Sequence, residues 1–122
     1  MGKSRIRVVV KRVGEFPRVE HVLNTLEGLQ ALLDGGPLEA VSIHPKLNAL
    51  GVHVYCDEEG KLKSLPMNFP IFGGEDVICG TAVFSKSDEE GEEVGLTAHE
   101  AVEVVRVLMR EILQMPLPLE GD

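Results

Sequence analysis

Aromatic residues are scarce in this sequence of 122 residues, which has no tryptophan, one tyrosine and four phenylalanines. The core of such a chain must be built from valine, leucine and isoleucine, and the 43% apolar fraction is ordinary for a globular domain. No apolar run approaches the roughly 20 residues that a membrane-spanning helix needs. Charges resume at Lys11, so the N-terminus has no signal-peptide core. We therefore expect a cytoplasmic protein without a membrane partner.

Cysteine is also rare, since the chain has only Cys56 and Cys79. Two cysteines without CxxC spacing do not make a disulfide framework. Each follows a stretch of apolar β-type residues, so we expect two buried free thiols. His53 precedes Cys56 by three positions in a predicted strand, which places their side chains on opposite faces. We therefore expect no metal site.

The motifs of common catalytic sites are absent. The chain contains no G-x-S-x-G, P-loop or HExxH pattern, and Asp76 has no second carboxylate at a defined spacing. We expect a non-enzymatic protein that holds no cofactor.

Charge is unevenly distributed along the chain. Six of the twelve lysine and arginine residues lie within the first eighteen positions, whereas residues 87–93, SDEEGEE, are acidic. The net charge of −8 argues against general nucleic-acid binding, because the field of the whole protein repels a phosphate backbone. A local anion site on the basic segment remains compatible with this charge. The acidic run is expected to be a solvated loop.

Hydrophobic periodicity predicts a single α+β domain over residues 1–115 and a short proline-containing tail over residues 116–122. Two helices are predicted, each opened by a capping box that starts at Asn24 or Thr97. The expected strands cover residues 5–13, 18–23, 38–43, 51–56, 61–66 and 76–85, and the expected helices cover residues 24–34 and 98–114. The order ββαββββα indicates one mostly antiparallel sheet of five or six strands, with both helices on one face, similar to a β-grasp arrangement.

Residues 76–85, DVICGTAVFS, are apolar at both parities. Such a strand is covered on both faces, or is covered on one face and lies in a subunit contact on the other. Together with the apolar stripe of the last helix, it offers more apolar surface than one sheet and two helices cover. We therefore expect a homodimer or a higher homo-oligomer.

The loop that leads into this strand is the predicted site. Its two prolines and its double glycine fix an unusual backbone path and expose amide groups. Asn68 would supply directed hydrogen bonds and Phe69 a stacking surface, while an arginine of the first strand would neutralise an anion. The candidate ligand-binding residues are Arg5, Arg7, Asn68, Phe69, Gly73, Gly74, Asp76, Gly80 and Thr81. The alternatives are that the rings fold back into the core and that the glycines form a plain turn.

Three motifs carry a resemblance that spans most of the chain. They are a turn at residues 57–60 (DEEG), the pattern L-P-x-N at residues 65–68, and the strand pattern D-x-I-x-G-T-A at residues 76–82. With these motifs the chain resembles an uncharacterised domain family of phage, plasmid and conjugative-element proteins, although Asp57 stands where the family pattern has asparagine. The resemblance implies a genomic setting and no activity. Small non-enzymatic proteins of such elements often bind host proteins or host signalling molecules.

Two hypotheses about function follow. In the first, the protein captures a small anionic ligand, such as a nucleotide signal, between the loop at residues 66–74 and the basic first strand. In the second, it is an interaction module or inhibitor that docks on a host protein through an edge strand or through its acidic loop. A ligand released from the purified protein on denaturation would favour the first.

Overall fold

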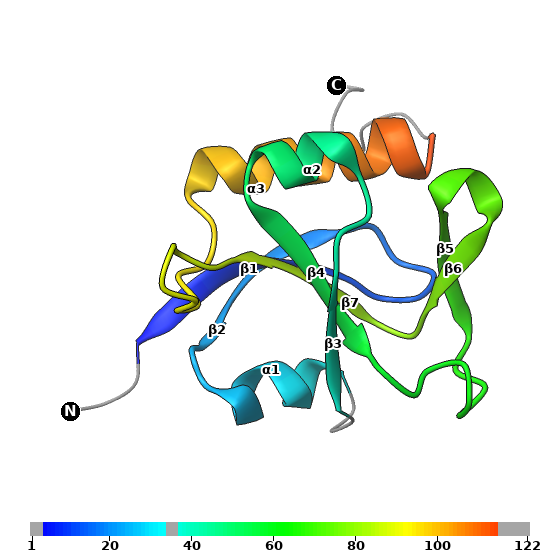
Figure 1. Ribbon diagram of the computed structural model, residues 1–122, viewed down its shortest axis with the longest axis horizontal. Coiled ribbons are helices and arrows are strands. Elements are labelled where there is room, and N and C mark those ends of the chain that lie inside the picture. Colours follow the sequence, from blue (N-terminus) through cyan, green and yellow to red (C-terminus); the bar gives the residue numbers. More distant parts are fainter. Residues whose placement is uncertain (1–3, 34–36, 115–122) are drawn as a thin grey trace.

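The computed structural model describes residues 4–33 and 37–114, so the predicted tail over residues 116–122 lies outside the described residues. The strands are β1 (Arg5–Lys11), β2 (Arg18–Leu23), β3 (Leu38–Val41), β4 (Val52–Asp57), β5 (Met67–Ile71), β6 (Asp76–Cys79) and β7 (Ala82–Lys86). The helices are α1 (Leu26–Leu32), α2 (Pro45–Ala49) and α3 (Ala98–Val107), with a 3-10 turn at Phe72–Gly74 and a π-helical turn at Leu108–Ile112. Figure 1 shows the main sheet between helices above and below it, with β5 and β6 to one side.

The main sheet has five strands in the order β2-β1-β7-β4-β3, and every neighbouring pair is antiparallel. β5 and β6 pair only with each other, as a separate two-stranded hairpin. The predicted α+β class and the antiparallel main sheet are therefore confirmed.

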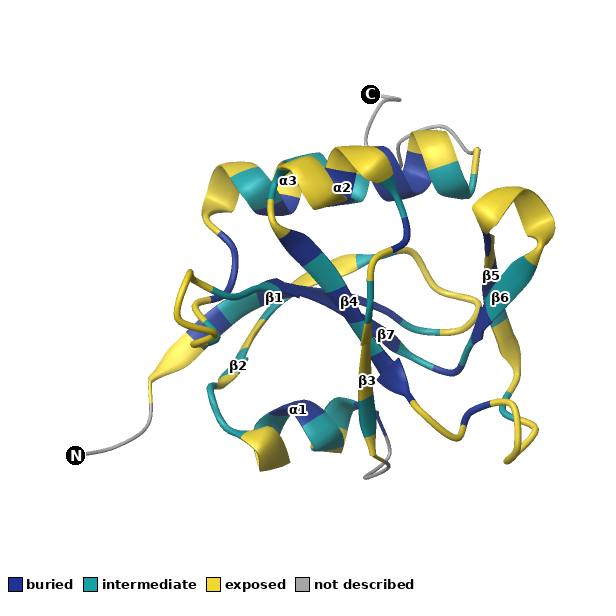
Figure 2. Ribbon diagram, viewed as in Figure 1, coloured by how far each residue is buried: buried dark blue, intermediate teal, exposed yellow. Residues whose placement is uncertain are grey.

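The helices lie on both faces of the main sheet rather than on one (Figure 1). Val9 and Phe84 belong to the core cluster under α2 and α3, whereas Val8 and Val83 belong to the cluster beneath α1. The cause is that β1 and β7 are apolar at both parities, so each face of the sheet needs a cover. Figure 2 shows the result, with the central strands buried and β2 largely exposed.

The strand predicted over residues 76–85 divides between two sheets. Gly80 adopts a positive φ of 80° between β6 and β7, and its N–H donates to Pro66 O at 2.8 Å. The left-handed conformation favours glycine, so this residue ends one strand and redirects the chain into the other. Residues 82–85 of β7 are buried within one chain, with Val83 and Phe84 at 0% exposure. The apolar surface that we expected to be available for a subunit contact is therefore used inside the fold.

Three further segments differ from the predicted elements. Residues 67–71, expected as part of the site loop, form the strand β5, which pairs with β6. Residues 61–66 form a turn and not a strand, because Lys63 N donates to Glu59 O and Leu65 N to Gly60 O, both at 2.9 Å. For residues 44–50, HPKLNAL, the sequence predicts a loop or an irregular edge. Residues 45–49 instead form the short helix α2, with proline at its start and His44 as its cap. His44 Nδ1 accepts a hydrogen bond from Lys46 N at 3.1 Å.

The ends of the two predicted helices are capped as follows. Thr97 and Glu100 form the predicted capping box at the start of α3. The first helix begins one position later than predicted, since Thr25 is its cap and accepts a hydrogen bond from Gly28 N at 2.9 Å. Asn24 instead donates through Nδ2 to Glu93 O at 2.9 Å. None of the described helices has the length and apolar character that crossing a bilayer requires.

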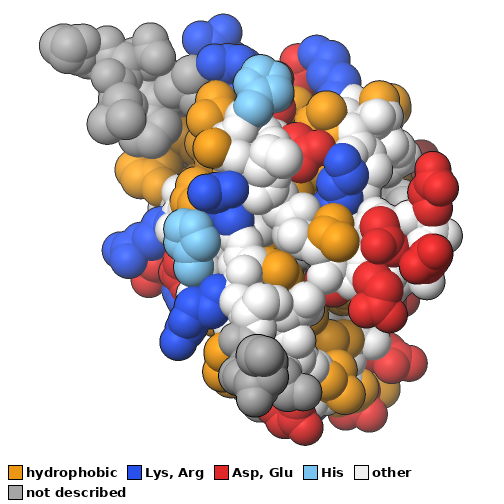
Figure 3. Space-filling model, turned by 90° about the vertical axis from the view of Figure 1, so that its left-hand side faces the viewer, with side chains coloured by type: hydrophobic (Ala, Val, Ile, Leu, Met, Phe, Trp, Pro, Cys, Tyr) orange, Lys and Arg blue, Asp and Glu red, His pale blue; other side chains and the backbone are white. Residues whose placement is uncertain are grey.

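Charged side chains are segregated on the surface. Figure 3 shows acidic side chains gathered toward one side of the molecule and basic ones toward the other. Asp88, Glu89, Glu90 and Glu92 of the acidic loop are exposed, as the sequence predicts, whereas Glu93 turns inward.

Candidate functional site

The β5–β6 hairpin contains most of the predicted site residues. Residues 67–71 pair with residues 76–79, with a register shift between Met67 and Phe69. Gly73 and Gly74 make the connecting turn at positive φ, 66° and 94°. Four cavities formed by described residues each include residues of this hairpin, so the hairpin borders all four of them.

Phe69 and Asn68 attach the hairpin to the main sheet. The Phe69 side chain is 2% exposed and stacks on Phe84, with 6.4 Å between ring centroids, so its ring faces the core. Asn68 Nδ2 donates to Lys11 O at 2.7 Å and to Gly80 O at 2.8 Å. Asn68 Oδ1 accepts from Lys11 Nζ at 2.9 Å. The amide therefore holds β1, β5 and the β6–β7 link together.

Lys11 is the unexpected member of this arrangement. The residue is only 4% exposed, and its Nζ donates to two neutral oxygens, Asn68 Oδ1 and Arg12 O, at 2.9 and 2.8 Å. Burial lowers the pKa of the amine, and the charge of Glu15 partly opposes this effect. The ion pairs between described residues within 4 Å do not include Lys11. Buried lysines are usually paired, so a cation in this position suggests a site for an anion.

Lys11 and Asn68 both line a cavity of about 300 Å³, and we call it the Lys11 pocket. Its lining residues are Lys11, Gly14, Glu15, Phe16, Asn68 and Leu113. The Phe16 ring is 50% exposed and thus offers an apolar surface beside the buried cation. The lining thus combines the polar side chains of Lys11, Glu15 and Asn68 with the apolar ones of Phe16 and Leu113, and a few polar groups among apolar walls are typical of small-molecule sites.

The two arginines predicted for the site lie elsewhere on β1. Arg7 Nη1 donates to Leu96 O at 3.0 Å, and Arg5 Nη1 lies 3.5 Å from His21 O. Arg7 precedes Lys11 by four positions, which is about 13 Å along a strand. The structure therefore brings Asn68 together with Lys11 and leaves both arginines at the other end of β1.

The remaining predicted residues surround other parts of the hairpin. Gly73 and Gly74 line a cavity of about 480 Å³ that His44 and Glu111 also line. Asp76 forms an ion pair with Lys61, and its Oδ1 also accepts from Val77 N at 2.8 Å. Thr81 and Gly80 form the link between β6 and β7.

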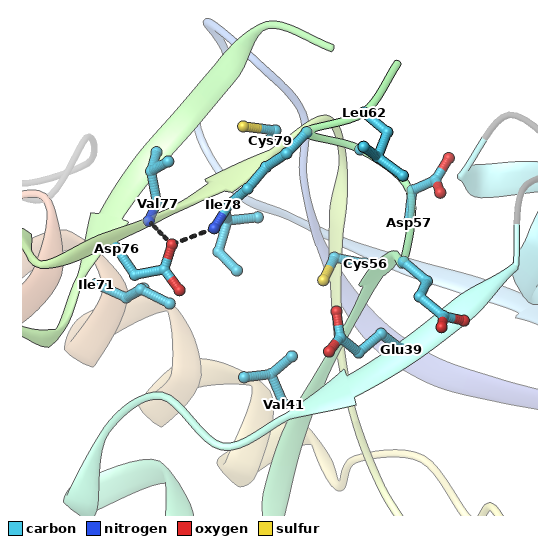
Figure 4. A pocket seen from close by; sticks show the side chains of 13 residues that line it. Glu39, Val41, Cys56, Asp57, Leu62, Ile71, Asp76, Val77, Ile78 and Cys79 are labelled. Atoms are coloured by element: carbon cyan, nitrogen blue, oxygen red, sulfur yellow. Dashed lines mark hydrogen bonds and ion pairs between the residues drawn. The ribbon is translucent and has the colours of Figure 1, made fainter. Parts of the chain in front are cut away.

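A further cavity, of about 240 Å³, separates the hairpin from the β3 edge of the main sheet (Figure 4). Cys56 points into it from β4, whereas the Cys79 thiol points away. Burial, and next the charges of Glu39 and Asp57, raise the pKa of Cys56 to about 11, which makes this thiol a poor nucleophile at neutral pH. Both cysteines are free, as expected, but only Cys56 is buried, since Cys79 is half-buried on the hairpin strand β6. The described residues include no group of three or more histidine, cysteine or acidic side chains placed to hold a metal ion.

A buried polar cluster, missed by the sequence analysis, lies on the α1 face of the sheet. Tyr55 Oη donates to Glu93 Oε1 at 2.6 Å, and His53 Nε2 lies 3.4 Å from Glu93 Oε2. Burial alone would raise the pKa of Glu93, but interactions with His53, Ser85 and Tyr55 outweigh it and lower the value to about 2. Burial and the neighbouring carboxylate raise the pKa of Tyr55. The cluster anchors the acidic loop. The sequence contained one indication of this cluster: in β4, His53 and Tyr55 alternate with Val52 and Val54, so the histidine and the tyrosine lie together on the face opposite the valines.

Comparison with known families adds one finding. The family model described as domain of unknown function DUF3846 matches residues 6–109. The chain belongs to this family. The match runs from the second residue of β1 through α3, so it includes the hairpin, the buried cluster and every lining residue of the Lys11 pocket except Leu113. Neither the search of curated proteins nor that of solved structures returned a match.

Proposed function

We propose that this member of the DUF3846 family is a non-enzymatic binding protein that holds a small anionic ligand in the Lys11 pocket. The observation that carries the proposal is the buried ammonium group of Lys11, which contacts only neutral oxygens in the hydrogen bonds described and belongs to a residue that lines a cavity. The Glu15 carboxylate opposes the effect of burial only in part and forms no ion pair with Lys11 within 4 Å. Burying a charge without a close partner is costly, and an anionic ligand would lower that cost. Binding would also explain why a lysine and not an apolar residue ends β1.

The pocket favours a ligand of limited size and charge. A volume of about 300 Å³ is at the lower end of the range for small-molecule sites, so we expect a molecule of mononucleotide size or smaller. One cation with the Glu15 carboxylate nearby compensates a single negative charge better than several. Phe16 would stack on a planar group of the ligand. A singly charged anion with a ring, such as a cyclic nucleotide or an aromatic carboxylate, meets these conditions.

Thermal unfolding of the purified protein tests the proposal. The probes are cyclic AMP, AMP and benzoate, added over a range of concentrations. A ligand at one hundred times its dissociation constant stabilises the folded state by about 2.7 kcal/mol, which corresponds to a rise of roughly 10 °C in melting temperature for a domain of this size. Denaturing freshly purified protein and analysing the released molecules by mass spectrometry covers ligands outside this panel.

The decisive variant is Lys11→Met, which keeps the apolar stem and removes the charge. We expect it to fold, because methionine fills the same space and only hydrogen bonds to neutral oxygens are lost, at about 1 kcal/mol each. It should no longer be stabilised by the ligand. Lys46→Met is the matched control, since Lys46 is an exposed lysine whose ion pair with Glu111 lies on the surface. Equal stabilisation of both variants would refute the Lys11 site.

A second candidate function is docking on a basic surface of another protein through the acidic loop. It is favoured by the anchoring of this loop, since Glu93 holds it to the sheet while four carboxylates remain exposed. A preformed array of charges accelerates association with an oppositely charged partner. Association that falls steeply with added salt, with no effect of small ligands, would favour this function. The mobile-element setting implied by the resemblance remains a prediction.

A further inference from the structure

The strand β2 is an open edge of the main sheet. It pairs with β1 over six positions without a register shift, and it has no strand neighbour on its other side in the described sheet. Val19 and Leu23 on this strand are 47% and 41% exposed. A regular edge strand with exposed apolar side chains is a template for pairing with another strand.

The backbone groups that point outward from β2 follow from the pairing with β1. Asn24 N donates to Ser4 O at 2.8 Å, and this pair continues the β1–β2 register. In an antiparallel ladder, hydrogen-bonded pairs alternate with pairs whose N–H and C=O groups point away. The outward groups of β2 therefore belong to Val19, His21 and Leu23.

The same three residues are exposed, as is Arg18 at the start of the strand. They lie opposite Val9, Arg7 and Arg5, so they are on the α3 face of the sheet. Here α3 covers β1 but leaves β2 open, as the exposure of Val19 and Leu23 indicates. Apart from the Leu23 carbonyl, which accepts from Thr25 N, the outward hydrogen-bonding groups and the exposed side chains thus coincide on alternate residues, which is what an added strand requires.

We propose that two copies of this chain associate through β2, antiparallel, about a twofold axis at His21. In this register, the two His21 residues form the central hydrogen-bonded pair, and each Val19 lies opposite Leu23 of the partner subunit. A twofold interface must be self-complementary, and here one register satisfies both the backbone groups and the apolar side chains. The proposal does not depend on the Lys11 pocket.

The charges near β2 do not prevent this association. Arg7 lies beside His21 on the neighbouring strand, so the two Arg7 residues of a dimer are three strand spacings apart, about 14 Å. This exceeds the screening length of about 8 Å at physiological salt. The contact of Arg5 Nη1 with His21 O is long, at 3.5 Å, and exposed, so strand pairing can replace it. The Leu23 carbonyl already accepts from Thr25 N at 2.9 Å, which concentrates the new bonds around His21.

Cysteine cross-linking tests the register directly. In a Cys79→Ser background, which removes the half-buried native thiol, His21→Cys places two thiols across the axis. The Cα atoms of such a pair are about 5.5 Å apart, within the range that a disulfide spans. We expect a covalent dimer on mild oxidation. Arg18→Cys is the matched control, because its two copies would be about 20 Å apart. Cross-linking of both variants, or of neither, would overturn the proposed register.

Proline substitution tests the association without a cross-link. The His21 N–H points away from β1, so His21→Pro removes a donor from the open edge and leaves the β1–β2 ladder intact. We expect His21→Pro to weaken association about tenfold or more, as the loss of two symmetry-related hydrogen bonds implies, while His21→Ala remains dimeric. Light scattering measures the mass, and circular dichroism confirms the fold. A monomeric wild type at micromolar concentration, or a His21→Pro variant that remains fully dimeric, would refute the proposal.

Discussion

Replacement of Glu93 by glutamine is expected to destabilise the protein in a strongly pH-dependent way. The Glu93 carboxylate is 12% exposed and contacts Tyr55 and His53, which both come from β4. These contacts depend on its negative charge, since Tyr55 donates to it and His53 lies at ion-pair distance. Glutamine keeps the shape of the side chain and removes the charge, so Glu93→Gln isolates the electrostatic contribution.

The magnitude follows from the pKa of Glu93, which is lowered from 4.5 to about 2 in the folded protein. Each unit corresponds to about 1.4 kcal/mol, so ionisation of Glu93 contributes about 3 kcal/mol to the free energy of unfolding. Because the folded-state pKa is below the unfolded-state value, this contribution is complete above pH 4.5. It is lost progressively as the pH falls from 4.5 to 2.

The assay is the melting temperature of both proteins between pH 2 and pH 7. At pH 7 the Glu93→Gln variant should melt roughly 10 °C below the wild type, and the two curves should converge toward pH 2. Glu92→Gln is the control, because it changes the net charge equally at an exposed position of the same loop. Parallel curves for the wild type and Glu93→Gln over the whole range would show that the reasoning about this cluster is wrong.

Three further predictions concern packing, capping and backbone conformation. Phe84→Ala removes a fully buried ring stacked on Phe69 and should cost about 3–5 kcal/mol, measured by urea unfolding; a loss below 1 kcal/mol would contradict the packing described. Thr97→Ala removes the α3 cap and should cost about 1 kcal/mol in the same assay, whereas an unchanged midpoint would mean that the capping box contributes nothing. Gly95→Ala should lower the melting temperature far more than Gly91→Ala. Both glycines have positive φ, but a Cβ at Gly95 would lie 2.7 Å from the Ile6 Cβ, whereas a Cβ at Gly91 would have no atom within 4 Å. Equal melting temperatures of the two variants would disprove the close approach at Gly95.

The first two strands and the last helix could be predicted because their signals are local. Alternation over Arg5–Lys11 and the capping box at Thr97 depend on neighbouring residues only. The break within residues 76–85 could not be read from periodicity, because both β6 and β7 are apolar and only Gly80 marks the change of sheet. The segment 61–66 alternates like a strand, yet its backbone bonds close locally onto Glu59 and Gly60.

The candidate site was predicted in part for a similar reason. Asn68 and its loop stood out through proline and glycine, whose backbone preferences are visible in any sequence. Lys11 could not be recognised as a site residue in the sequence, because a lysine that ends an alternating strand is normally exposed. Its burial depends on contacts with Asn68 and on the approach of Leu113, which are distant in the sequence. The inward position of Glu93 could not be predicted either, because in the sequence it is one acidic residue among several that are exposed.

The β5–β6 hairpin is a shared wall of several cavities, so a ligand in one of them can affect groups that border another. The hairpin is joined to the main sheet through the 80–81 link and the hydrogen bonds of Asn68, and it borders cavities on several sides. If the hairpin shifts when one cavity is filled, the other cavities that it borders change shape with it, and we expect their occupancies to be coupled. A ligand that fixes Asn68 against Lys11 should slow the reaction of Cys79, on the second strand of the hairpin, with a thiol reagent. The native cysteine then serves as a reporter for events at a pocket that it does not line.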